Sequence, residues 1–200
     1  MKPFPQELRA QFKIFSSLRT PIAIQNFIEA IPMNFGESCR SPLLALHHDK
    51  AHCMEGALIA AACFWYHGAE PMLLDLKTTD ADDSHVVAPF RVNKLWGAIS
   101  KTNHAILRYR DPVYRSVREL ALSYFHEYYM DDGAKTLRSY AGPFKLLSLG
   151  DSWLTTKEHM DSISDLIDKS KHVSIVPKGL KLRRADPIER SMVRHTTWKR

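Results

Sequence analysis

Residues 52–68 read HCMEGALIAAACFWYHG, a stretch rich in strong helix formers. Alanine and leucine dominate it, and no proline interrupts residues 54–66. Apolar residues would fall on every face of such a helix, which predicts that it is buried rather than half-exposed. Gly68 supplies the left-handed residue that ends it. The sequence therefore predicts a central buried helix on which the rest of the chain packs.

Cys53 lies in the first turn of this predicted helix. There the unpaired backbone N–H groups and the positive end of the helix dipole favour a thiolate. Cys53 is therefore a candidate nucleophile, with a pKa expected below that of a free thiol. Cys63, in mid-helix, is interpreted as a small core residue. The alternative interpretation of Cys53 is also structural: a buried helix cysteine that takes no part in a reaction.

The composition is that of a soluble globular protein, with 44% hydrophobic and 25% charged residues in a chain of 200. The sequence has no internal repeat and no low-complexity linker, which predicts one domain, 1–200. Its core is expected at about 20–130 and a C-terminal helical extension at about 131–200. No apolar run reaches the about 18 residues of a membrane helix, and residues 1–7 lack a signal-peptide core. We therefore expect a cytoplasmic location and no membrane partner. Three widely spaced cysteines suit free thiols.

The net charge of +6 raises the question of nucleic-acid binding. No zinc-finger spacing, RNP-like aromatic motif or glycine-rich phosphate loop accompanies the charge. A solvated basic face is the simpler interpretation, so nucleic acid is not an expected partner. Much of the excess lies in the tail, at Lys178, Lys181, Arg183, Arg184, Arg190, Arg194, Lys199 and Arg200.

The segments beyond the central helix predict a small antiparallel sheet and flanking helices. Strands are expected at residues 71–76, 85–91 and 95–100, with further strand-like segments at 105–109 and 172–176. Helices are expected at residues 6–18, at 21–31, from Pro42, after an Asp111 N-cap, after Thr155 and from Pro187. Residues 135–152 are expected to be irregular, with a turn at Gly142-Pro143. The predicted fold class is α+β.

A hairpin between the second and third strands would complete a site. A two-residue turn at Val92-Asn93 puts His85 opposite Ser100 and leaves Asn103 just beyond that strand end. A thiol nucleophile needs a base within hydrogen-bond reach, and the base needs an orienting group. The pattern therefore predicts Cys53 as the nucleophile and His85 as its base. The alternative for His85 is a cap on the acidic loop 80–83, which would raise its pKa.

These motifs resemble the transglutaminase-like superfamily, whose members share a papain-like core. The resemblance covers about residues 22–111 and implies a papain-like fold in which the helix cysteine attacks and the strand histidine acts as base. In that family an aspartate usually orients the histidine, four residues after a tryptophan, and here that position is Ser100. The matching parts are Cys53, EGA at 55–57, HGAEPMLL at 67–74, HVV at 85–87 and WGAIS at 96–100.

The third member of the site stays open among three residues. Ser100 matches by position, but a serine offers the imidazolium no charge. Asn103 would copy the asparagine of papain-like enzymes. Asp111 has the right chemistry and is the predicted N-cap of the next helix. The oxyanion donors would be the Cys53 backbone N–H and one side-chain amide, from Gln25, Asn26 or Asn34.

The resemblance implies attack of Cys53 on an amide or acyl carbon, a thioester intermediate, and transfer to water or an amine. The expected substrates are peptides, amides or acyl compounds, with no cofactor. The alternatives are an acyl transferase and a non-catalytic interaction domain with a degenerate triad. A metal site is not expected, because the spacing of the nearby ligands matches no structural zinc pattern. Those ligands are Cys39, His47, His48, His52 and Cys53.

Overall fold

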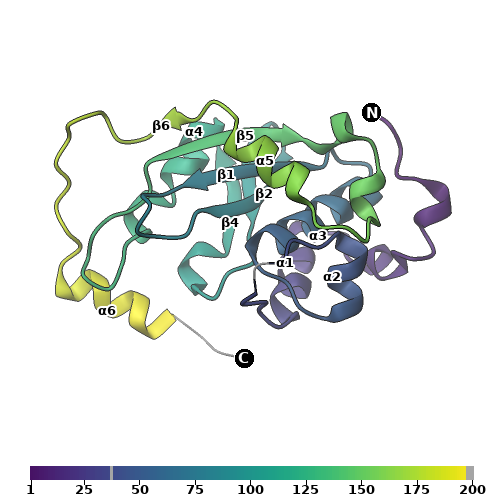
Figure 1. Ribbon diagram of the computed structural model, residues 1–200, viewed down its shortest axis with the longest axis horizontal. Coiled ribbons are helices and arrows are strands. Elements are labelled where there is room, and N and C mark those ends of the chain that lie inside the picture. The colour runs from purple at the N-terminus through teal and green to yellow at the C-terminus, as the bar shows by residue number, and fades with distance from the viewer. Residues whose placement is uncertain (37, 197–200) are drawn as a thin grey trace.

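A six-stranded antiparallel sheet runs through the molecule (Figure 1), whose computed structural model describes residues 1–36 and 38–196. The strand order is β4-β3-β2-β1-β5-β6, and every neighbouring pair is antiparallel. The combination of this sheet with separate helices confirms the predicted α+β class. The strands are β1 (Met72–Lys77), β2 (His85–Val92), β3 (Leu95–Ile99), β4 (Tyr109–Tyr114), β5 (Ser139–Lys145) and β6 (Val173–Ser174).

Helices lie on both faces of the sheet, and Figure 1 shows α1, α2 and α3 gathered together with α4 apart from them. The α-helices are α1 (Pro21–Ala30), α2 (Pro42–His48), α3 (Cys53–Tyr66), α4 (Val117–Leu122), α5 (Asp161–Asp168) and α6 (Pro187–Thr196). The 3-10 helices are η1 (Gln6–Leu8), η2 (Lys13–Ser17), η3 (Ala105–Leu107), η4 (Phe125–Glu127), η5 (Leu146–Leu149) and η6 (Ser152–Leu154). No helix in residues 1–36 or 38–196 is both long and apolar enough to span a bilayer.

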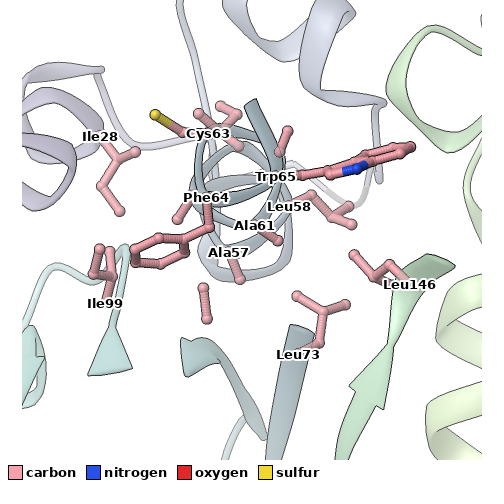
Figure 2. Close-up of a cluster of buried hydrophobic side chains, with 14 of the residues drawn as sticks. Ile28, Ala57, Leu58, Ala61, Cys63, Phe64, Trp65, Leu73, Ile99 and Leu146 are labelled. Carbon is pink, nitrogen blue, oxygen red and sulfur yellow. The ribbon is translucent and has the colours of Figure 1, made fainter. Parts of the chain in front are cut away.

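The predicted central helix is confirmed as α3, in which every residue from Met54 to Trp65 is buried. Its all-round apolar surface is covered by α1, α2 and one face of the sheet, as the pattern of residues 54–66 predicted. Gly68 follows it with φ of +84°, the left-handed conformation expected at a helix end. Figure 2 shows Ile28, Leu73, Ile99 and Leu146 around the helix.

The other face of the sheet carries a second apolar cluster. Leu74 and Leu76 of β1 and Val87 of β2 pack there with Leu120 and Tyr124. Leu73 and Val86, their neighbours in sequence, belong to the cluster around α3. Because successive side chains of a strand alternate between faces, both faces of the central strands are buried.

The hairpin between β2 and β3 differs from the predicted one by two residues in register. The turn residues are Asn93 and Lys94, with φ of 50° and 70°, and Val92 pairs with Leu95. Positive φ at both central residues is the type I′ geometry, whose twist matches that of the flanking strands. The predicted turn at Val92-Asn93 was therefore wrong, because Asn93 tolerates the left-handed conformation better than Val92 does.

The prediction of a helix N-cap at Asp111 was also wrong. Asp111 lies within β4, and Ser116 caps the helix instead, its side chain accepting a hydrogen bond from Glu119 N. β4 is an edge strand with a register shift opposite Trp96 and Ala98. Pro112 has no backbone N–H to donate to a neighbouring strand. It is tolerated in β4 because an edge position or a bulge does not require that hydrogen bond.

Four further segments depart from the expectations. The helix expected at residues 6–18 is replaced by two short 3-10 helices, η1 and η2. β5 occupies 139–145 inside the stretch expected to be irregular, and its glycine, Gly142, lies at a register shift against β1. A side chain at Gly142 would meet Leu73 O at 2.9 Å. Glycine therefore allows the backbones of β5 and β1 to approach closely at this point. Residues 105–107 form η3, and the helix expected after Thr155 begins only at Asp161. α6 begins at Pro187 as predicted, and residues 197–200 lie outside the described residues.

Candidate functional site

A cavity of about 400 Å³ opens where α3 begins and β2 starts. Cys53, His85 and Asn103 all line it. Further parts of its wall come from segments far apart in the sequence, among them the loop at 33–36, the acidic loop at 82–84, residues 101–104 after β3 and residues 127–129 at the end of η4. The cavity therefore brings together three of the four predicted site residues, while the fourth, Ser100, lies behind it.

The start of α3 is held by a hydrogen-bonded cap built on Glu55. His52 Nδ1 accepts a hydrogen bond from Met54 N at 3.2 Å, and Glu55 Oε2 accepts from His52 N at 3.0 Å. Glu55 is wholly buried, and it also accepts from Arg40 N and Asn34 Nδ2, each at 3.0 Å. One buried carboxylate thus ties two loops to the helix end that carries the thiol.

Sequence reasoning missed this role of Glu55. The available signal was the capping-box spacing, in which a glutamate follows three residues after the N-cap. The unusual cap residue, His52, concealed the signal, because histidine is not among the preferred N-caps.

The Cys53 thiol has a raised pKa, contrary to the expectation from its helix position. Burial is the largest cause, and the charges of Asp83 and Asp75 raise the pKa further. Backbone N–H groups of Val86 and Met54 act in the opposite direction, but they do not outweigh the loss of water. The residue keeps some exposure along the cavity, yet the dense packing around its sulfur dominates. The resting thiol is therefore protonated at neutral pH.

His85 is buried and lies with its Nε2 atom 2.5 Å from Ser100 Oγ. Burial lowers its pKa to about 4, and repulsion from the protonated form of His104 and from Arg110 adds to the effect. The alternative of a cap on the acidic loop, which would raise the pKa, is therefore wrong. At rest, neutral imidazole faces the cavity together with a neutral thiol.

The predicted proximity of Ser100 and His85 is present, although the register is not the predicted one. Ala88 pairs with Ile99, so the ladder extended by three residues puts His85 opposite Thr102 and makes Ser100 its diagonal neighbour. Diagonal neighbours share a face of the sheet, and their side chains meet when they are directed toward each other.

The other two candidates for the third position form no hydrogen bond with His85 among the described residues. Asn103 lines the cavity, but within the described residues no hydrogen bond joins its side chain to the His85 ring. Asp111 is exposed on β4, which is separated from β2 by β3. Likewise, no hydrogen bond joins Cys53 Sγ to His85 in the part of the chain that the structure describes. The two groups thus face one cavity without a hydrogen bond between them, as is common before a substrate is bound.

The three amides considered for the oxyanion site have different positions. Gln25 is buried and pairs with the backbone of Ser100, and Asn26 accepts a hydrogen bond from Arg108 at 3.4 Å. Only Asn34 lines the cavity, where its Nδ2 donates to Ser38 Oγ at 2.9 Å as well as to Glu55. The amide hydrogens of Asn34 are thus already engaged, whereas the Cys53 backbone N–H at the helix start is in the expected place.

Two of the residues considered as metal ligands are engaged or buried in the fold. His52 Nε2 lies 2.6 Å from Ser38 O, and Cys39 is buried. Within residues 1–36 and 38–196, no group of three or more histidine, cysteine, aspartate or glutamate side chains is arranged to hold a metal ion.

Comparisons with known proteins do not assign the chain to a family. A scan against protein-family models and a search of curated proteins both found no match. The geometry of the cavity around Cys53 and His85 is therefore the basis for the function proposed next.

Proposed function

We propose that this chain is a cysteine-dependent hydrolase or acyl transferase with a transglutaminase-like, papain-like core. It would act on an amide or acyl group through a thioester at Cys53. One observation carries the proposal: Cys53, the first residue of α3, shares a cavity of about 400 Å³ with a buried histidine that is hydrogen-bonded to Ser100.

The hydrogen bond to Ser100 assigns the two nitrogens of His85 to different tasks. If Nε2 carries the proton and donates to Ser100 Oγ, Nδ1 keeps its lone pair and can accept the thiol proton of Cys53. Both groups are neutral at rest, so the proton moves during the attack and not before it. This is general-base activation of a thiol rather than a preformed ion pair.

The reaction then follows two balanced steps. The Cys53 sulfur bonds to the carbonyl carbon while its proton passes to His85, and the leaving amine or alcohol takes that proton as its bond to carbon breaks. Water or an amine attacks the resulting thioester, His85 accepts a proton from it, and the proton returns to the departing thiolate. The Cys53 backbone N–H at the start of α3 would stabilise the oxyanion of both steps.

Acyl-enzyme trapping tests this proposal. The protein is incubated with p-nitrophenyl acetate, and with a glutamine-containing peptide and an amine, and the modified residue is located by peptide mass mapping. Acylation of Cys53 is expected in the wild type, with loss in Cys53→Ala and strong slowing in His85→Gln. The exposed His48 supplies a matched control, since His48→Gln should react like the wild type. An acyl group on another residue, or none with any donor, contradicts the proposal.

A second candidate function is a non-catalytic interaction domain that retains the fold. It is favoured by one observation, the raised pKa of Cys53 combined with a neutral serine behind His85. A domain of this kind would show no turnover, and its Ser100 variants would not change the reactivity of the thiol.

A further inference from the structure

The cavity beside Cys53 has an acidic wall made by one ordered loop. Asp82 and Asp83 line it, and the loop is tied down on both sides. Asp82 Oδ2 accepts from Thr136 Oγ1 at 2.5 Å, and Tyr128 Oη donates to Asp83 O at 2.7 Å. The Asp83 carboxylate itself accepts no hydrogen bond and forms no ion pair with any described residue. The exposed Asp83 side chain therefore places a carboxylate at the cavity without a partner among the described residues.

One lysine on the cavity wall offsets part of this charge. Lys101 is buried, and its ammonium group donates to Glu29 O at 3.3 Å and to Ile31 O at the end of α1. Its single positive charge is thus bound to backbone carbonyls of α1 and its C-cap. No arginine is among the described residues that line the cavity, and Glu127 on its wall forms an ion pair with Arg110.

Three histidines line the cavity, His52, His85 and His104. Both ring nitrogens of His52 are engaged by backbone atoms, Nδ1 with Met54 N and Nε2 with Ser38 O. Burial lowers the pKa of His85 to about 4 and also lowers the pKa of His104. Among the described residues that line the cavity, Asp82, Asp83 and Glu127 are acidic and Lys101 is the one lysine or arginine, so acidic side chains predominate there in a chain whose net charge is +6.

Aromatic side chains stand on the same cavity. Tyr128 and Tyr129 line it, and Phe35 at its edge is 82% exposed. An aromatic face attracts a cation by about 0.5–2 kcal/mol and has no such preference for an anion. A largely exposed phenylalanine on a cavity wall thus matches the charge of the acidic loop.

We infer that the Cys53 cavity selects a substrate group that carries a positive charge, and that Asp83 is the residue that recognises it. This inference rests on the proposed role of Cys53 as the reactive group. It names the chemical class of the ligand, a primary or quaternary ammonium or a guanidinium, and it excludes carboxylates and phosphates from the same position.

The same arrangement links recognition to reactivity. The charge of Asp83 raises the pKa of Cys53, so a cation bound against Asp83 would offset that effect and favour transfer of the thiol proton. An anion in the same place would oppose it. Substrate charge therefore acts both on binding and on the nucleophile.

Three methanethiosulfonates that differ only in their end group test the inference. The end groups are trimethylammonium, methyl and sulfonate. In each reaction the Cys53 thiolate forms a disulfide with the reagent's sulfenyl sulfur and methanesulfinate leaves. Rates are normalised to those of the urea-unfolded protein, which removes intrinsic differences between the reagents. Peptide mapping confirms that the label is on Cys53, since Cys39 and Cys63 are buried.

The folded wild type should favour the cationic over the anionic reagent by about tenfold or more at low salt, with the neutral reagent between them. The preference should shrink at 1 M NaCl, where charges are screened within about 3 Å. Asp83→Asn should reduce the ratio several-fold. Asp80→Asn removes the same charge from an exposed residue of the same loop that does not line the cavity, and it should leave the ratio nearly unchanged.

The outcomes separate this inference from the proposed function. Equal normalised rates for the three reagents at Cys53, or an equal effect of both aspartate variants, overturn the charge selection and leave the thiol chemistry standing. A Cys53 that reacts with none of the reagents in the folded protein overturns both.

Discussion

Gln25 holds the backbone of Ser100 through two hydrogen bonds. Its Nε2 donates to Ser100 O at 2.9 Å, and its Oε1 accepts from Ser100 N at 3.0 Å. The side-chain amide thus continues the ladder at the end of β3 and connects α1 to the residue that contacts His85. Gln25 is a positioning residue, since it acts on His85 through Ser100.

Gln25→Met should therefore lower the free energy of unfolding by about 2–4 kcal/mol, because it leaves a buried N–H and a buried C=O without partners. Urea denaturation measures the change. The exposed neighbour Asn26 is the control, and Asn26→Ala should change stability by no more than about 0.5 kcal/mol. Similar values for the two variants would mean that water replaces the lost hydrogen bonds.

The residue at position 100 should control the reactivity of Cys53. Ser100→Asp puts a charge behind His85, and charged hydrogen bonds are about twice as strong as neutral ones. We expect iodoacetamide to alkylate this variant about tenfold faster than the wild type at pH 7, and Ser100→Ala to react more slowly. The measurement is the alkylation rate at Cys53 as a function of pH. Three superimposable curves would favour the non-catalytic interaction domain.

The buried His85 should make stability fall in mild acid. Its pKa is lowered from 6.5 to about 4, so between these values the unfolded chain binds a proton that the folded chain does not. The stabilisation is fully present above pH 6.5 and is lost as the pH falls toward 4, by up to about 3 kcal/mol. Urea denaturation at several pH values tests this. His85→Gln should flatten the curve in this window, whereas His48→Gln should not.

Gly56 should resist substitution although it lies inside a helix. Helix propensity alone predicts that Gly56→Ala stabilises the protein by about 1 kcal/mol. The new methyl group would lie 2.2 Å from Lys101 Cβ, however, and the Lys101 ammonium is held at the end of α1. Overpacking of this kind costs about 1–3 kcal/mol, so we expect net destabilisation. A rise in the melting temperature would show that the Lys101 stem can move aside.

His172 should stabilise the fold by pairing with a buried carboxylate. Its Nε2 lies 2.8 Å from Asp75 Oδ2, and its Nδ1 lies 2.8 Å from Ser170 O. Burial raises the pKa of Asp75, and His172 opposes that effect. His172→Ala leaves the carboxylate unpaired and should cost about 3–5 kcal/mol. Lys169→Ala removes only an exposed ion pair and should cost less than about 1 kcal/mol.

A double-mutant cycle checks the Asp75–His172 assignment. If the two residues are coupled, Asp75→Asn combined with His172→Ala should destabilise the protein by less than the sum of the single changes. Additive values would indicate that each side chain acts through other contacts.

Local features of the chain were sufficient to predict several elements. The apolar pattern of residues 54–66 predicted α3, because burial on every face follows from composition along a single helix. α1 and α2 begin at Pro21 and Pro42 as expected, each after a hydroxyl N-cap, Thr20 or Ser41, because a cap depends on residues three apart. The proximity of His85 and Ser100 could also be predicted from the sequence, because a hairpin brings its two strands together whichever turn it uses.

Tertiary structure decided the properties that depend on distant segments. The pKa of Cys53 is raised because the sheet and the acidic loop remove water from a helix start that would favour a thiolate if exposed. Gln25 reaches Ser100 across 75 residues, and no pattern near either residue predicts that contact. The acidic and aromatic character of the cavity also depends on tertiary structure, since Asp83, Tyr128 and Phe35 come to line one cavity only in the folded chain. Helix start and residue type are local properties, whereas desolvation and charge are sums over all atoms nearby, wherever they lie in the sequence.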